Sequence, residues 1–328
     1  MRNRTLRACA AILAMSASGF IPVACGAVNE TQPAATLWRH ADGSENASFL
    51  VAKGTINVRL DQRRMDLPRE AIERWICTAA RAVASCYGRF PVPDVQLSIS
   101  IGGESGIQHG VTYAGRRIRI SLGAHTRQQD LDNDWVLTHE MFHLACPDLD
   151  ESHLWLEEGL ATYLEPFARA RAGTLNVERM WHDLVRDMPQ GLPRGGDRGL
   201  DRTHTWGRTY WGGALFCLVA DIRIRERTLG KHSLQDALTA ILNAGGDGRE
   251  HWDIERVLAV GDTALVEPIL APLYRELALK PGGVDLPTIW RRLGIVVRSG
   301  RIDFDDTAEM AGVRQSMTAH MALSNALK

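Results

Sequence analysis

The residues whose types and spacing most clearly suggest a reactive site are His139, Glu140 and His143, which form the pattern H-E-x-x-H. Histidines four residues apart on a helix lie about 40° apart around its axis and one turn along it, so both imidazoles can reach one metal ion. Glu140 lies beside them and can act on a water molecule at that ion. Apolar neighbours at helical spacing, including Trp135 and Leu144, favour a helix here. The pattern indicates a metal centre suited to hydrolysis.

A third ligand is expected downstream, because a catalytic zinc site has three protein ligands and one open position. The segment 155–161 reads W-L-E-E-G-L-A and supplies two adjacent carboxylates, Glu157 and Glu158, on the next expected helix. An antiparallel helix pair joined by a five-residue loop, 147–151, would bring Glu158 level with His143. The alternative interpretation of Glu158 is a solvated helix carboxylate.

Three motifs in this order resemble those of the gluzincin zinc metallopeptidases: H-E-x-x-H, then W-[LF]-x-E-G-[FL]-[AT], then a helix that begins Y-W-G-G-A-L at 210–215. The third is similar to the Y-x-K-G-A-L helix of the glycyl aminopeptidase-like branch. The resemblance covers residues 95–240. It implies an α+β catalytic domain of thermolysin-like, gluzincin type, with one zinc ion held by His139, His143 and Glu158.

The resemblance also implies a mechanism of peptide-bond hydrolysis. Zinc lowers the pKa of a bound water, and Glu140 takes its proton during attack on the peptide carbonyl and delivers it to the leaving amine. Tyr210 stabilises the oxyanion together with the metal. Two alternatives stay open at this point: Tyr210 as a buried core aromatic, and His204 in the oxyanion role.

The sequence departs from the family pattern at the position that would hold a substrate's free amine. The segment 110–113 lies where gluzincin aminopeptidases carry a Glu for that purpose, and it has none; Glu104 is the only acid nearby. Gly212 replaces the lysine of the third motif, and the spacing from His143 to Glu158 is shorter than in better-known gluzincins. Endopeptidase and aminopeptidase activities therefore both remain open. A catalytically degenerate gluzincin-fold binding protein and hydrolysis of a non-peptide substrate are the alternatives.

The segments before the motif are expected to form a sheet-rich lobe, about 50–125, that supports the motif helix. Apolar and polar residues alternate at 56–60 and 95–101, as they do in half-buried strands. A strand–turn–strand unit is predicted over 111–120, and a helix begins near Pro68 between the first two strands.

The segments from 132 onward are predicted to be mostly helical, with the zinc-site helices within 132–172 and a helical lobe over 173–328. A stretch rich in Gly, Pro and Arg predicts a loop at 191–202, and Ser299-Gly300 predicts the turn of a hairpin at 296–304. Strands followed by helices indicate an α+β architecture. The helices themselves are predicted at 132–146, 150–172, 206–228 and from Ser233 to about 245.

Residues 1–27 are interpreted as a secretory signal, because a basic start precedes an uncharged apolar stretch and small residues allow cleavage after Ala27. The end of that stretch also resembles a bacterial lipobox, which would make Cys25 a lipidated N-terminus and the one membrane contact. The protein is therefore expected in the periplasm or outside the cell. Residues 28–328 would form a single metallopeptidase unit, in which 28–50 is loosely structured.

The cysteines that remain after removal of that signal are Cys77, Cys86, Cys146 and Cys217. Cys77 and Cys86 are nine residues apart on one predicted helix, a rise of about 13 Å, which is too far for a disulfide. The other pairings stay open, with buried free thiols as the alternative.

The composition is that of an ordinary globular protein and excludes some classes of function. The 328 residues carry a formal net charge of −1, and 45% of them are hydrophobic. A near-neutral protein lacks the broad basic surface that binds nucleic acids, so the expected partner is a peptide or protein substrate. No segment after the signal reaches the ~18–20 apolar residues of a membrane span. The nine tryptophans are scattered, and most are interpreted as packing residues.

Overall fold

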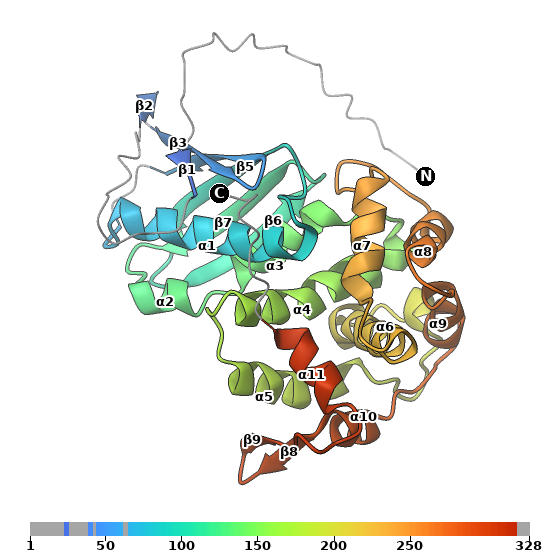
Figure 1. The fold of residues 1–328 in the computed structure, drawn as a ribbon. Helices are drawn as coiled ribbons and strands as arrows, with labels where there is room; N and C mark the ends of the chain where they lie inside the picture. The colour runs from blue at the N-terminus through green and yellow to red at the C-terminus, as the bar shows by residue number, and fades with distance from the viewer. Residues whose placement is uncertain (1–22, 26–38, 42–43, 62–64, 320–328) are drawn as a thin grey trace.

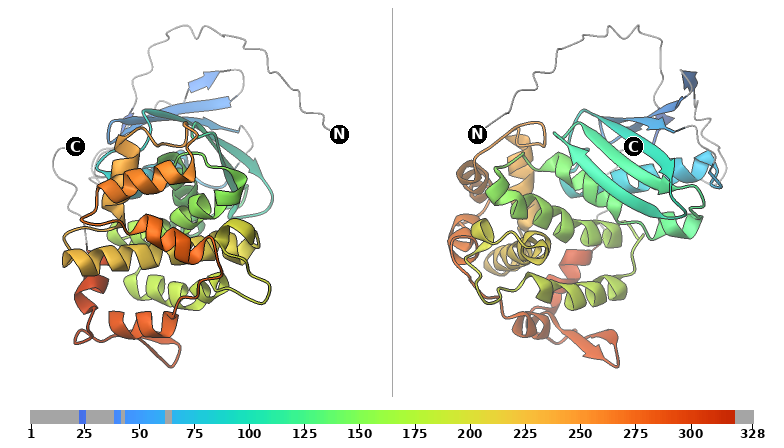
Figure 2. Two further views of the ribbon diagram at one scale, coloured as in Figure 1. Left: turned by 90° about the vertical axis from the view of Figure 1, so that its right-hand side faces the viewer. Right: turned by 180° about the vertical axis from the view of Figure 1, so that it is seen from behind.

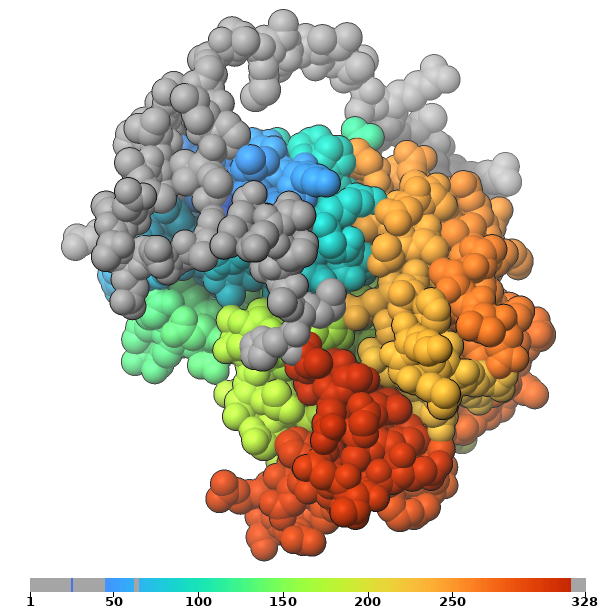
Figure 3. All heavy atoms as spheres, viewed as in Figure 1, coloured from blue at the N-terminus to red at the C-terminus, as the bar shows by residue number. Residues whose placement is uncertain are grey.

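The computed structural model describes residues 23–25, 39–41, 44–61 and 65–319, and it consists of a sheet lobe followed in sequence by a helical lobe (Figure 1). The predicted signal segment lies outside the described residues except for its part at 23–25. In the space-filling view the two lobes abut along a broad boundary (Figure 3). The change from strands to helices confirms the predicted α+β order.

A mixed seven-stranded sheet forms the first lobe. Its strands are β1 (Val23–Ala24), β2 (Arg39–Ala41), β3 (Ser44–Val51), β4 (Gly54–Leu60), β5 (Asp94–Gly102), β6 (Ile107–Tyr113) and β7 (Arg117–Gly123). They lie in the order β1-β3-β4-β5-β7-β6, with β2 also paired to β3. The central strands β4, β5 and β7 are parallel, and β6 pairs antiparallel with β7 at one end of the sheet. Within the described residues, one edge of β6 has no strand beside it.

The strand β3 corrects the expectation that 28–50 is loosely structured. Ala47, Phe49 and Val51 are buried and alternate with Ser48 and the exposed Leu50, and the strand pairs antiparallel with β4 over 45–51. This period-two pattern was hidden because the residues before it are polar and carry no strand signal. The expectation for 28–50 was therefore wrong at its C-terminal end.

One face of the sheet is covered by helix α1 (Arg69–Tyr87), which connects β4 to β5 (Figure 1). Its apolar side, which includes Ile72 and Ile76, is fully buried, as its spacing predicted. Strand β5 buries Val95 and Leu97 toward this side and exposes Gln96 between them. Among the described residues, no helix covers the other face of the sheet, which is seen from behind in Figure 2.

The helical lobe follows the sheet and ends in a β-hairpin and a last helix. Its helices are α2 (Gln128–Asp132), α3 (Val136–Phe142), α4 (Leu154–Arg171), α5 (Val177–Asp187), α6 (Gly213–Thr228), α7 (Leu234–Asn243), α8 (Ile254–Thr263), α9 (Leu270–Leu277), α10 (Leu286–Leu293) and α11 (Ala311–Thr318). The hairpin consists of β8 (Ile295–Arg298) and β9 (Arg301–Phe304), and its turn at Ser299-Gly300 confirms the prediction. Among the described residues, no helix has both the length and the apolarity needed to cross a bilayer.

Three predicted helices have different boundaries in the structure. The helix expected at 132–146 begins at Val136 and changes to a 3₁₀ turn, His143–Ala145. The helix expected at 150–172 starts with a 3₁₀ turn before α4, and the helix expected at 206–228 contains a π-helical turn, Arg208–Gly212, before α6. Local propensity predicted the existence of these helices, but capping interactions and packing determine where they start.

A disulfide joins Cys25 to Cys77 on α1, with the two Cα atoms 5.5 Å apart. Cys86, Cys146 and Cys217 are free and buried, which confirms that Cys77 and Cys86 do not pair. The free-thiol alternative is wrong for Cys77. Cleavage after residue 27 would remove Cys25, and a thioether-linked lipid would occupy its sulfur, so this disulfide is incompatible with both forms of the N-terminus.

Candidate metal centre

The helix α3 carries the H-E-x-x-H motif, and Asp134 determines where it begins. The Asp134 carboxylate accepts hydrogen bonds from the backbone N–H groups of Val136 at 2.8 Å and Leu137 at 3.1 Å. It also accepts one from the indole N–H of Trp75 at 2.8 Å. The backbone bonds cap the first turn of the helix. Burial raises the pKa of Asp134, and these hydrogen bonds act in the opposite direction. The contact with Trp75 ties the motif helix to α1.

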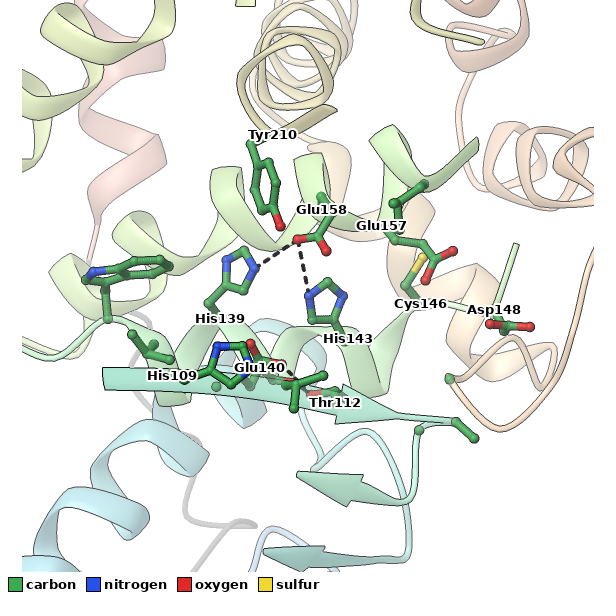
Figure 4. A pocket seen from close by; sticks show the side chains of 18 of the residues that line it. His109, Thr112, His139, Glu140, His143, Cys146, Asp148, Glu157, Glu158 and Tyr210 are labelled. Atoms are coloured by element: carbon green, nitrogen blue, oxygen red, sulfur yellow. Dashed lines mark hydrogen bonds and ion pairs between the residues drawn. The ribbon is translucent and has the colours of Figure 1, made fainter. Parts of the chain in front are cut away.

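The same helix lies directly against the edge strand β6 because Gly110 has no side chain. A Cβ atom at Gly110 would lie 2.9 Å from Cγ of Glu140, which is closer than such atoms normally approach. Next to it, Oγ1 of Thr112 donates a hydrogen bond to Glu140 Oε2 at 2.7 Å and also lies 2.8 Å from the Glu140 carbonyl oxygen. The strand therefore determines the direction of the Glu140 carboxylate (Figure 4).

The three residues predicted to bind a metal ion, His139, His143 and Glu158, converge on one point (Figure 4). Glu158 Oε2 lies 3.2 Å from His139 Nε2 and 3.5 Å from His143 Nε2, and one ligand atom of each residue lies within 4.8 Å of the others. Ligand atoms around a tetrahedral zinc ion, with bonds of about 2.0–2.1 Å, are roughly 3.3 Å apart. The donor set and its spacing therefore fit zinc.

The neighbouring imidazoles keep the carboxylate of Glu158 in the ionised form that binds a cation. Burial would raise the pKa of Glu158, but hydrogen bonds and charge from His139 and His143 lower it to about 2. Burial would lower the pKa of His143, but the hydrogen bond to Glu158 and the charges of Glu158, Glu140 and Glu157 raise it. Glu158 is therefore a carboxylate beside two imidazoles, and a cation would compete with a proton at His143, because only a neutral imidazole binds a metal ion.

Tyr210 lies over the ligands from the opposite side to Glu140 (Figure 4). It occupies the π-helical turn before α6, and such turns occur frequently at functional sites. Its ring is stacked on His139, with centroids 6.3 Å apart. Burial and the nearby carboxylates of Glu158 and Glu140 raise the pKa of Tyr210 to about 12, so the hydroxyl keeps its proton at neutral pH. Tyr210 is only partly buried, so the core-aromatic alternative is wrong.

The remaining candidates from the sequence lie elsewhere. His204 and Glu104 are exposed and do not line the metal pocket, which has a volume of about 480 Å³. Glu157 does line it, beside Cys146 and Asp148 (Figure 4).

Glu157 also belongs to the site, although it falls on the variable position x of the second motif and no role was predicted for it. Burial raises the pKa of Glu157 to about 7, although the hydrogen bond that its Oε1 accepts from the Leu149 N–H at 3.0 Å acts in the opposite direction. The only available sequence signal was its position beside Glu158 in the second motif.

The structure is similar to known structures, although two comparisons of the sequence found no match. No protein-family model matches the sequence, and no curated protein is significantly similar to it. The structure is similar to an aminopeptidase N family protein from Idiomarina loihiensis, with a TM-score of 0.60 over 77% of this chain, at 13% identity. The protein has an aminopeptidase N-like fold. It spans about half the length of that relative, since the match covers 49% of it.

Two structures of M1 zinc metallopeptidases from a second organism are less similar to this one. An M1 zinc metallopeptidase from Deinococcus radiodurans matches 70% of this chain and 49% of its own, with a TM-score of 0.45 and 17% identity. A variant of an M1 zinc metallopeptidase from that organism, bound to a Tyr-Ser-Ala substrate, matches 72% of this chain and 52% of its own, with a TM-score of 0.48 and 16% identity.

Proposed function

We propose that the protein is a zinc-dependent metallopeptidase of gluzincin type, with motifs that resemble those of the glycyl aminopeptidase-like branch. The observation that carries this proposal is the convergence of His139, His143 and Glu158 on one point, with Glu140 on one side and Tyr210 on the other. Two imidazoles and a carboxylate form a ligand set used by catalytic zinc in peptidases. The aminopeptidase N-like fold supports the same activity.

The proposed reaction is hydrolysis of a peptide bond. Zinc, held by His139, His143 and Glu158, would supply a Lewis acid that acidifies water and polarises a carbonyl group. Glu140 accepts the proton of the attacking water and then delivers it to the leaving amine. The hydrogen bond from Thr112 holds the Glu140 carboxylate in one orientation for both transfers.

Tyr210 is the residue that would face the developing oxyanion. Its raised pKa keeps the phenol protonated, so its O–H can donate to a negatively charged oxygen. Stacking on His139 and on Trp206 limits the rotation of its ring. A donor held in place before the reaction loses little freedom during it, which favours the transition state.

The edge strand β6 is the surface on which we place an extended peptide. The edge of β6 that has no strand beside it among the described residues borders the metal pocket, and Gln108, Gly110 and Thr112 line that pocket from the strand. Main-chain hydrogen bonds to such an edge bind peptides without demanding a particular sequence. Endopeptidase and aminopeptidase specificity are both compatible with this placement.

We also propose that the protein is exported to the periplasm or the cell exterior. Disulfides persist in oxidising compartments, and the Cys25–Cys77 bond joins the N-terminal strand to α1. This bond favours a mature protein that still contains Cys25 with an unmodified thiol. Mass spectrometry of the exported protein, before and after reduction, tests both points.

The test of the proposed activity compares the wild-type protein with Glu140→Gln. Wild type should bind one zinc ion per molecule and cleave members of a peptide library, and the variant should keep its zinc and lose roughly 10²–10⁴-fold in rate. Wild type without stoichiometric zinc would refute the metal site. Zinc with no difference between the two proteins would favour the alternative, a catalytically degenerate binding protein.

Peptides with and without a blocked N-terminus resolve the specificity in the same experiment. Cleavage of blocked peptides identifies an endopeptidase, and a strict requirement for a free amine identifies an aminopeptidase. Hydrolysis of esters or other amides, with no peptide cleavage, would instead support a non-peptide substrate.

A further inference from the structure

The loop 191–202, for which the sequence predicted only a connection, packs tightly against the π-helical turn that carries Tyr210. Gly191 lies directly on the backbone of that turn, because a Cβ atom there would lie 2.3 Å from one of its carbonyl carbons. A Cβ atom at Gly212, inside the turn, would lie 2.6 Å from the side chain of Leu200 in the loop. Glycine at both positions lets loop and turn approach more closely than residues with side chains could. The loop therefore acts as a scaffold for the turn.

The direction of Tyr210 depends on the persistence of this π-helical turn. Tyr210 lies at its middle, between Arg208 and Gly212. Such turns are rare in proteins, because they insert one residue into an α-helix. Conversion to regular α-helix would rotate the residues before the insertion by about 100° relative to α6, the rotation of one residue. The Tyr210 hydroxyl would then no longer point toward the metal ligands, so the turn needs contacts that hold it.

Arg208, the first residue of the turn, supplies these contacts. It is only 5% exposed, although its guanidinium is charged. Its Nε lies 2.8 Å from Oδ2 of Asp197 in the loop, and its Nη2 donates a hydrogen bond to Oδ1 of the same carboxylate at 3.4 Å. Its Nη1 donates a hydrogen bond to the carbonyl oxygen of Gly191. One buried side chain therefore joins the turn to two separate points of the loop.

The loop in turn holds Asp197 and contacts the metal-ligand helix. Oδ1 of Asp197 accepts a hydrogen bond from the backbone N–H of Gly199 at 2.8 Å, and Gly199 has a φ of 96°, which favours glycine. Farther along the loop, Oδ1 of Asp201 accepts a hydrogen bond from the indole N–H of Trp155 at 2.8 Å. Trp155 lies on α4, three residues before Glu158. The loop thus connects the π-helical turn to the helix that carries a candidate metal ligand.

A buried ion pair at this place is better suited to fixing a geometry than to stabilising the fold. Removing two charges from water costs about as much as their attraction returns, so such pairs often contribute no more than apolar residues of similar size. A guanidinium, however, binds a carboxylate in a defined plane and direction. The Arg208–Asp197 pair therefore favours one arrangement of turn and loop over others.

We propose that Arg208 and Asp197 are positioning residues that hold the π-helical turn and thereby keep the Tyr210 hydroxyl over the metal ligands (Figure 4). The proposal rests on the proposed peptidase function, in which Tyr210 faces the oxyanion, and adds two residues to it. Neither Arg208 nor Asp197 lines the metal pocket. Their effect on the reaction therefore passes through Tyr210, while the metal ligands on α3 and α4 stay in place.

The kinetic test uses Asp197→Asn, which removes the charge of this side chain with almost no change in its shape. The variant should lose about tenfold in kcat, less than the ~10²–10³-fold expected for loss of an oxyanion donor in Tyr210→Phe. Its KM and its zinc content should stay unchanged. In the Tyr210→Phe background, Asp197→Asn should have no further effect, because the hydroxyl to be positioned is already gone. Equal losses of kcat in both backgrounds would indicate a general effect on the fold and overturn the proposal.

A matched control breaks another buried ion pair. Asp221 pairs with Arg225 at 3.0 Å on α6, and both side chains are as buried as those of Arg208 and Asp197. Asp221→Asn should leave kcat unchanged, and a loss as large as that of Asp197→Asn would overturn the proposal. Arg208→Lys keeps the charge but cannot reach both Asp197 and the Gly191 carbonyl, so it should reproduce the loss of kcat. It takes the place of Asp197→Asn if that variant does not fold.

A spectroscopic measurement separates this proposal from the peptidase function. Protein labelled with fluorotyrosine gives a fluorine NMR resonance for Tyr210, which is assigned by its loss in Tyr210→Phe. The rings of His139 and Trp206, stacked on Tyr210 with centroids 6.3 Å and 5.6 Å away, set the position of this resonance. Asp197→Asn should shift it and Asp221→Asn should not, even if no peptide is cleaved. An unshifted resonance in Asp197→Asn overturns the positioning role, and peptide cleavage by the wild-type protein would then leave the peptidase function standing.

Discussion

The contact between Gly159 and Gly213 provides the sharpest test of how the fold positions Tyr210. Gly159 follows the ligand Glu158 on α4, and Gly213 begins α6 directly after the π-helical turn of Tyr210. A Cβ atom at Gly159 would overlap the backbone of Gly213 and lie 2.8 Å from Ala214 N, where ordinary contacts are 3.4–4 Å. Backbone atoms, unlike those of a flexible side chain, have no other rotamer to adopt, so Gly159→Ala must separate the two helices by on the order of 1 Å.

The expected cost follows from two opposing effects. Overpacking of a buried contact costs typically about 1–3 kcal/mol, occasionally more, and alanine in a helix recovers roughly 0.5–1 kcal/mol relative to glycine. A net loss of about 1–2 kcal/mol in the free energy of unfolding lowers Tm by roughly 2–3 °C in a chain of this length. Tyr210 should also move relative to the metal ligands, which lie on α3 and α4, so kcat should fall about tenfold while zinc content stays at one ion per molecule.

The assay combines urea unfolding, zinc analysis and steady-state kinetics on Gly159→Ala and on a matched control, Gly312→Ala. Gly312 lies near the start of α11 with nothing within 4 Å of a Cβ atom, so alanine there should be neutral or stabilise by about 0.5 kcal/mol. Wild-type stability and kcat in Gly159→Ala would refute the idea that this contact sets the distance between Tyr210 and Glu158.

Three further predictions concern other parts of the molecule. Thr112→Val should lower kcat about tenfold without loss of zinc, and Thr112→Ser should restore it by again donating to Glu140; equal kinetics in all three would exclude the positioning role. Cys77→Ser should lower the free energy of unfolding by about 4 kcal/mol on the chain-entropy model, since Cys25 is 52 residues away, and dithiothreitol should destabilise wild type but not the variant. Burial raises the pKa of Glu165 from 4.5 to about 7 despite its ion pair with Arg169. The protonated side chain therefore stabilises the folded protein fully below pH 4.5, and this stabilisation, up to ~3 kcal/mol, is lost as pH rises through 7. In Glu165→Gln the slope of unfolding free energy between pH 5 and 8 should flatten, and an unchanged slope would contradict this assignment.

The candidate metal ligands were predictable because their arrangement is mostly local. Two histidines four residues apart share one helix face whatever surrounds the helix, and Glu158 follows on the next helix after a short connection. The strand alternations at 56–60 and 95–101 and the Ser299-Gly300 turn are local patterns of the same kind, and all three appear in the structure. The strand at 44–51 was missed because its alternation follows a polar stretch.

The tertiary structure alone decided what surrounds those ligands. Thr112 and Glu140 are 28 residues apart and meet only because Gly110 lets β6 approach α3 closely. Trp135 and Trp206 come from segments 71 residues apart and looked like ordinary packing residues, yet both line one cleft beside the metal site. The sequence by itself therefore determined the candidate metal-binding residues, since helical periodicity sets the spacing of those side chains. Packing between distant elements decided the direction of the Glu140 carboxylate, the placement of Tyr210 and the shape of the cleft, because backbone contacts at glycines and the burial of side chains from both lobes are not encoded in any local pattern.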